Sequence, residues 1–168
     1  VQTCALPIYA IKEFRGLRPD LRVTVVDDDP VTTMEKVRSG ELDLGIGSFA
    51  KAAAGVRQTL FFRFTLMVIR PDSEGAPRRA STTWSALKGE TLILPSLKSV
   101  RSAIDQHLAA AGVTTTPAML LNRLDTIVGM VEAGHGTAIV PSYALPACKH
   151  RRVAISRTCW FCGRTRSA

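Results

Sequence analysis

The sequence lacks long apolar runs. None approaches the roughly 20 consecutive apolar residues that cross a bilayer. The opening stretch VQTCALPIYA has no basic region before its apolar residues and no clear cleavage site. We therefore expect a cytoplasmic protein with no membrane partner. Hydrophobic residues at 46% and charged residues at 21% indicate a globular chain of one ordinary domain or two small lobes.

Acidic residues are too few to balance the basic ones, but the imbalance is local. The chain has 22 Lys and Arg against 14 Asp and Glu, a net charge of +8. Residues 149–168 hold six of the basic residues and no acid, which leaves 16 basic and 14 acidic residues in the rest. The body has no broad positive field that would attract phosphates. We do not expect it to bind nucleic acid by charge.

Cysteine is scarce and confined to the ends of the chain, at Cys4, Cys148, Cys159 and Cys162. A disulfide scaffold would spread its cysteines through the sequence, so reduced thiols are expected. The C-x-x-C pair together with Cys148 and His150 could be imagined as a zinc cluster, but the spacing C-x10-C-x2-C fits no zinc pattern. We predict no metal and no cofactor.

Catalytic motifs are also absent. The sequence has no G-x-S-x-G, no G-x-x-x-x-G-K-[ST] and no G-x-G-x-x-G at a strand-to-helix turn. His107 is expected to pack on a helix, His135 to belong to a turn, and Asp27–Asp29 to cap a helix in preference to binding a cation. An α/β enzyme using Asp43 or His135 stays an alternative, although no nucleophile–base pair is visible. We predict no catalytic residues and no enzyme.

Helix and strand signals alternate in the first half. Apolar residues at helical spacing over 8–17 predict a helix that ends before Pro19. Asp29 as N-cap, Pro30 at the first helical position and Gly40 as stop predict the next helix. The flanking segments LRVTVVD and LDLGIG are apolar and short, which predicts two strands, at 21–27 and 42–47, in a βαβ unit.

The second half continues the alternation. The patterns predict strands at 65–70, 91–95, 136–142 and 152–156, a loop at 71–82, one or two helical turns at 84–89, and helices at 99–111 and 125–133. Ser96 or Ser99 is expected to cap the helix that begins near 99.

Two strand-to-helix junctions suggest a binding site. Ligands of open parallel sheets settle at the carboxyl ends of strands, where helix N-termini present N–H groups. Gly45–Phe49 and Pro95–Ser99 follow predicted strands, and both offer hydroxyl groups. The second adds Lys98 and a helix N-terminus, so an anion would suit it.

Five stretches together carry a family resemblance: FRGLRPDLRVTVVD, VRSGELDLGIGSF, TLMVIRPD, SAIDQHLAAAGV and NRLDTIVGMVEAGHGTAIVPSYALP. From about residue 8 to 146, the chain resembles the effector-binding domain of LysR-type transcriptional regulators. The resemblance implies an α/β, two-lobed, periplasmic-binding-protein-like (type 2) fold with parallel-rich sheets flanked by helices. Lobe one would be residues 1–66 and incomplete, lobe two 67–150, and a return strand with a divergent basic tail 151–168.

The same resemblance implies that a small polar or anionic effector, carboxylates included, binds between the lobes and controls transcription. Mapped onto this sequence, the effector-binding residues would be Gly47, Ser48, Phe49, Pro95, Ser96, Ser99 and Asn122, with the glycines of GIGSF leaving room for the ligand. The parent protein would be a homodimer or tetramer that binds DNA through a winged helix-turn-helix, which nothing in this sequence matches.

The chain also departs from the family pattern. VQTCALP does not supply the expected first strand of lobe one, and the tail after residue 147 replaces the helix and strand expected to complete that lobe. We interpret the chain as a fragment whose two ends, including residues 1–7, are foreign or frame-shifted. A free-standing solute-binding protein of the same fold is the alternative, but it should carry an export signal and complete lobes, and the sequence shows neither.

Overall fold

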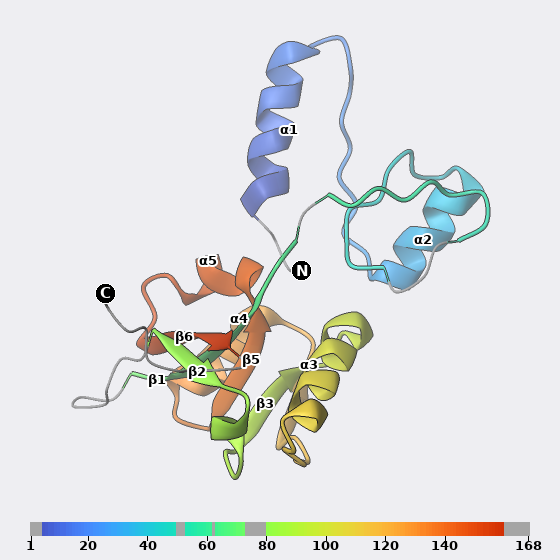
Figure 1. The fold of residues 1–168 in the computed structure, drawn as a ribbon. Coiled ribbons are helices and arrows are strands. Elements are labelled where there is room, and N and C mark those ends of the chain that lie inside the picture. The colour runs from blue at the N-terminus through green and yellow to red at the C-terminus, as the bar shows by residue number, and fades with distance from the viewer. Residues whose placement is uncertain (1–4, 50–52, 62, 73–79, 160–168) are drawn as a thin grey trace, which may run out of the picture. The chain divides into compact units, whose positions relative to one another are not determined.

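A computed structural model describes residues 5–49, 53–61, 63–72 and 80–159. The chain divides into two compact units, residues 1–63 and residues 64–168 (Figure 1). No helix in the described part of the chain is long and apolar enough to span a membrane.

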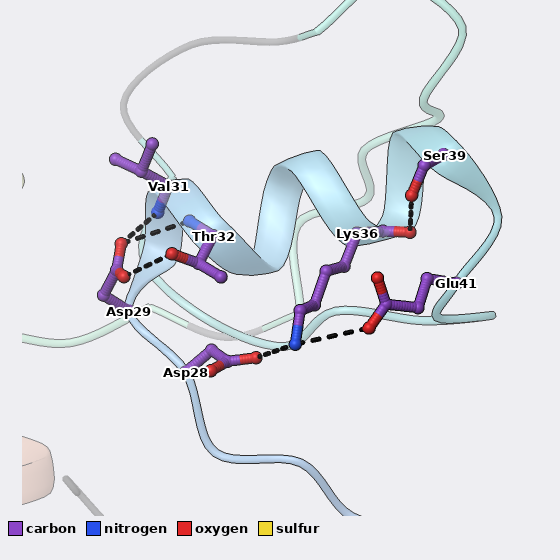
Figure 2. A network of polar contacts seen from close by, with 7 residues as sticks. All are labelled: Asp28, Asp29, Val31, Thr32, Lys36, Ser39 and Glu41. Atoms are coloured by element: carbon purple, nitrogen blue, oxygen red, sulfur yellow. Dashed lines mark hydrogen bonds and ion pairs between the residues drawn. The ribbon is translucent and has the colours of Figure 1, made fainter.

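Unit 1 contains the two predicted helices, α1 (Ala5–Leu17) and α2 (Pro30–Ser39). Asp29 caps α2 as predicted: its carboxylate accepts hydrogen bonds from the backbone N–H of Val31 at 2.8 Å and of Thr32 at 3.1 Å, and from the Thr32 hydroxyl at 2.6 Å (Figure 2). Gly40 ends the helix with φ 79°, a left-handed conformation that glycine adopts at little cost. The capping residues read from the sequence therefore fix both ends of α2.

Asp28 and Asp29, which precede α2, make contacts that stabilise this helix. Lys36 Nζ lies 3.1 Å from Asp28 and 3.3 Å from Glu41, so one ammonium ties both flanks of the helix to its middle (Figure 2). These two carboxylates, Asp28 first, raise the pKa of Lys36. The Thr32 hydroxyl and the two backbone donors lower the pKa of Asp29.

The strands predicted at 21–27 and 42–47 are wrong. These residues have no regular secondary structure, and the described residues of unit 1 contain no strand, so they form no βαβ unit. A strand needs a neighbouring ladder, whereas Val23 O accepts from Arg15 Nη2 at 2.9 Å and Leu42 N donates to Lys36 O at 3.1 Å. A segment whose sequence favours β structure still needs a neighbouring strand, and these two segments have none among the described residues.

Unit 2 is built on one six-stranded sheet in the order β2-β6-β1-β5-β3-β4. The strands are β1 (Leu66–Pro71), β2 (Ser81–Thr83), β3 (Leu92–Pro95), β4 (Met119–Leu121), β5 (Thr137–Pro141) and β6 (Val153–Cys159). The pairs β2–β6, β3–β4 and β3–β5 are parallel, and β1 is antiparallel to β5 and β6. The strand predicted at 152–156 is confirmed as β6, which returns beside β1.

Helices cover both faces of this sheet. α3 (Lys98–Ala110) places Val100, Ile104 and Leu108 against Leu92 and Leu94 on one face. On the other face, α4 (Leu124–Glu132) packs Leu124, Ile127, Val128 and Val131 against Ile69, Ile93, Ala138 and Val140. Alternate residues of a strand point to opposite faces, so the central strands are buried on both sides. This three-layer core explains their continuous apolar sequence.

The remaining short elements border this core. Ser85–Leu87 forms η1, the helical turn predicted at 84–89, whereas the strands β2 and β4 and the turns η2 (Ser142–Ala144) and α5 (Leu145–Cys148) were not predicted. The loop predicted at 71–82 includes β2 at its end, and its residues 73–79 lie outside the described part of the chain.

Candidate functional site

The carboxyl ends of β3 and β4 meet at one edge of the unit 2 sheet. These strands are parallel, with Pro95 opposite Leu121. Directly beyond them, Ser96 N donates to Leu121 O at 2.9 Å, and the Ser96 hydroxyl donates to Asn122 Oδ1 at 3.3 Å. Ser96 and Asn122 are both exposed, while Pro95 is buried beneath them. Three of the predicted effector-binding residues, Pro95, Ser96 and Asn122, therefore lie together, although Ser96 and Asn122 are 26 positions apart along the chain.

The orientation of this pair determines which groups it can offer. Asn122 Oδ1 is the acceptor of the Ser96 hydroxyl. The asparagine amide nitrogen, a donor of two hydrogens, is a separate group on the same side chain. The Ser96 hydroxyl proton is thus used within the pair, which holds the two strand ends together.

The N-terminus of α3 begins beside this pair. The residue preceding the helix is Leu97, whose side chain makes no capping hydrogen bond, so the predicted cap by Ser96 or Ser99 is wrong. Ser96 is one residue too early and is bonded to Asn122, and Ser99 already lies inside the first turn. A helix N-terminus carries partial positive charge, which favours anions when no acidic cap neutralises it.

Two cations flank the same edge. Lys98 opens α3, and Arg123 immediately follows Asn122 and precedes α4. Both are exposed, and neither forms an ion pair within the described residues. Arg123 was missed by the sequence interpretation, although its position next to Asn122 was the available signal. The nearest acid in sequence, Asp125, lies in the first turn of α4.

The remaining predicted site residues, Gly47, Ser48 and Phe49, belong to unit 1. A Cβ on Gly47 would lie 3.2 Å from Cζ of the Phe49 ring, and one on Gly45 would lie 2.8 Å from Thr33 Cγ2. The space that these glycines leave is occupied by Phe49 and by α2, not by an open hollow. Packing within unit 1 therefore explains the glycines, and the binding role of Gly47, Ser48 and Phe49 stays a prediction.

The described histidines and cysteines, which the sequence offered as possible catalytic or metal-binding residues, lie in packing contacts or in turns. The His107 ring stacks on buried Trp84 with centroids 4.7 Å apart, which confirms a packing role, and exposed His135 lies in the turn after α4.

Burial raises the pKa of the Cys148 thiol, which disfavours the thiolate that binds metals. Cys159 Sγ donates to Thr82 O at 3.5 Å, and Cys4 and Cys162 lie outside the described residues. Within the described residues no group of three or more His, Cys, Asp or Glu could hold a metal ion.

Comparison with known proteins decides the family. The family model described as the LysR substrate binding domain matches residues 5–161. The chain belongs to the LysR substrate-binding domain family. The match runs past both limits of the predicted resemblance, 8 and 146, and includes α5 and all of β6. This family belongs to transcriptional regulators and not to enzymes.

Relatives and solved structures agree with this assignment. The chain is 28% identical over 131 residues to a probable HTH-type transcriptional regulator LrrA of Synechococcus elongatus, covering 78% of this chain and 44% of the relative. The chain thus spans about half the length of the curated relatives it matches.

Two solved effector-binding domains share the fold at low identity. The BenM domain with its effector benzoate has a TM-score of 0.74 at 18% identity, covering 88% of this chain and 68% of that one. The QuiR domain in complex with shikimate has a TM-score of 0.75 at 16% identity, covering 89% and 72%. This LysR substrate-binding domain therefore has the predicted α/β, periplasmic-binding-protein-like type 2 fold.

Proposed function

We propose that this LysR substrate-binding domain is a sensor for a small polar or anionic metabolite, with carboxylates as the favoured class. The observation that carries the proposal is the exposed Ser96–Asn122 pair beside the uncapped N-terminus of α3. An uncapped helix N-terminus with two exposed flanking cations, Lys98 and Arg123, is suited to a carboxylate. The benzoate and shikimate bound by structural neighbours are both carboxylates, which supports the same class.

We further propose that Gly47, Ser48 and Phe49 of unit 1 contribute to effector binding. We assign three properties to the parent regulator: control of transcription, DNA binding, and assembly into a homodimer or tetramer. In this proposal the winged helix-turn-helix of the parent contacts DNA, and this chain alone does not. A gel shift at physiological salt tests that point: a tight, sequence-selective complex with this chain would contradict it.

A thermal-shift screen tests effector binding. We expect benzoate, shikimate or a related carboxylate to raise the Tm, and the uncharged amide of the same compound to have a smaller effect. A ligand that binds only the folded state adds about 2.7 kcal/mol at about 100 times its Kd. If no carboxylate in the screen stabilises the chain, the proposal is wrong.

Variants locate the site once a ligand is found. Asn122→Ala and Ser99→Ala should each reduce the ligand-induced rise in Tm, because each removes a polar group at the β3–β4 edge. Ser102→Ala is the matched control, since Ser102 is exposed on the same helix and farther from its N-terminus. A full thermal shift in both Asn122→Ala and Ser99→Ala would remove this edge from the binding site.

A further inference from the structure

Unit 1 contains a hollow that the proposed effector site does not use. It has a volume of about 530 Å³ and opens widely to solvent, because five of its six lining residues are exposed. Its lining comes from α1 and from the segment that follows it, and consists of Arg15, Pro19, Leu21, Arg22, Val23 and Thr24. None of these is among the predicted effector-binding residues.

The charged groups at this hollow are all cationic. Arg15 Nη2 donates to Val23 O at 2.9 Å, which orients the guanidinium and leaves its other N–H groups available. Arg22 makes no hydrogen bond or ion pair with any described residue. The nearby acid, Asp20, is held in a two-pronged contact by Arg18, with Nη2–Oδ2 at 2.9 Å and Nε–Oδ1 at 3.1 Å. Its charge is therefore already offset, and it is not part of the lining.

The rest of the lining is largely apolar. Pro19, Leu21 and Val23 supply hydrocarbon surface, and Thr24 adds one hydroxyl. Guanidinium groups bind carboxylates through paired hydrogen bonds, and an apolar wall accommodates the body of an organic acid. Phosphate or sulfate alone would leave that wall in contact with water. The combination of groups selects an organic anion with an apolar part.

We propose that this hollow is a second binding site, specific for small organic carboxylates with an apolar body and separate from the Ser96–Asn122 edge. Both arginines are exposed, so salt screens their attraction and binding is weak compared with a buried site.

The experiment is an NMR titration of the full chain with cyclohexanecarboxylate, followed on backbone amides. We expect saturable shifts at residues 15–24, and Arg22→Gln should weaken binding about fivefold by removing one charged fork. Arg38→Gln is the matched control, because Arg38 is exposed in the last turn of α2 and does not line the hollow. Raising the salt to about 1 M, where the Debye length is about 3 Å, should weaken binding further.

Three results would overturn the proposal: no saturable shifts at residues 15–24, equal binding by Arg22→Gln and the unchanged chain, or equal binding of the uncharged cyclohexanecarboxamide. Asn122→Ala separates this site from the effector site. That variant should keep the saturable shifts at residues 15–24, and their loss would also contradict a separate site.

Discussion

At the residue scale, His150 has a strained backbone conformation. Its φ is 66°, the only positive φ of a non-glycine residue in the described ranges. It lies in the turn after α5, where Arg151 N donates to Cys148 O at 3.1 Å. The left-handed region costs a residue with a Cβ about 1–2 kcal/mol. We predict that His150→Gly raises the free energy of unfolding by about 0.5–1 kcal/mol, measured by urea denaturation.

Lys149 provides the control for this prediction. It precedes His150 and has φ −64°, which any residue adopts without strain. Lys149→Gly should therefore only increase the entropy of the unfolded chain and lower stability by about 0.5–1 kcal/mol. Equal destabilisation by both glycine substitutions would show that the His150 conformation is not strained.

Asp29 supports a prediction about pH. The Thr32 hydroxyl and the backbone N–H groups of Val31 and Thr32 lower the pKa of its carboxyl below the ordinary 3.8. A lowered folded-state pKa means that capping stabilises α2 fully above pH 3.8, and that this contribution is lost as the pH falls through the lowered value. Asp29→Ala should reduce helix content measured by circular dichroism at neutral pH, and the difference from the unchanged chain should shrink in acid.

Asp29→Asn is the informative companion, because asparagine also caps helices but does not titrate in this range. It should keep most of the helix content and remove the acid transition of α2. An identical acid transition in Asp29→Asn would assign that transition to another carboxylate.

The capping residues of α2 were predictable from the sequence. Asp29, Pro30 and Gly40 specified α2 because capping involves neighbours only two or three positions away. The same reasoning failed at α3, where Leu97 stands at the N-cap position although Ser96 and Ser99 were both available. Ser96 is bonded instead to Asn122, a residue from another strand end. A contact distant in sequence overrode the local preference.

At the element scale, Gly136 determines how β5 joins the sheet. Its φ is 151°, and a Cβ there would lie 2.4 Å from the backbone oxygen of Thr91. That same oxygen accepts from Thr137 N at 2.9 Å, so it cannot withdraw without breaking the β3–β5 junction. We predict that Gly136→Ala lowers the free energy of unfolding by about 3 kcal/mol, from overpacking and backbone strain together. Thermal or urea unfolding measures this.

Gly129 is the matched control, within helix α4. Nothing lies within 4 Å of a Cβ added there, and its φ is not in the left-handed region. Gly129→Ala should raise the free energy of unfolding by about 0.5–1 kcal/mol, since alanine is the better helix former. A comparable loss in both variants would mean that the close approach at Gly136 does not determine its effect.

The elements of unit 2 were more predictable than those of unit 1. Strands β1, β3 and β5 are buried on both faces, so they appear as apolar runs, and α3 and α4 each present one apolar stripe. The edge strands β2 and β4 have only three residues each, too few for a period to appear. The antiparallel placement of β1 between β5 and β6 depends on long-range pairing and leaves no local signal.

At the scale of the whole molecule, the two units differ in how well they cover their apolar residues. The buried core lies in unit 2, whereas Val25, Leu44 and Ile46 of unit 1 are 65%, 73% and 52% exposed. They occupy the two segments whose sequences favour strands but which form no ladder. Only part of the candidate site was predictable for the same reason: Ser96 and Asn122 follow well-formed strands, whereas GIGSF was interpreted from a strand that is not formed.

Exposed, β-favouring segments without a ladder can pair with another copy of the chain. We predict that the chain associates as its concentration rises, and that Val25→Lys with Leu44→Lys reduces this association in sedimentation velocity. The control is Val31→Lys: Val31 is 68% exposed but lies on helix α2, whose backbone groups bond within the helix. If Val31→Lys reduced association as much as Val25→Lys with Leu44→Lys, the copies would associate through general apolar contact and not through strand pairing. A chain that stays monomeric at all concentrations would contradict the prediction, because it would mean that these two segments do not act as open strand edges.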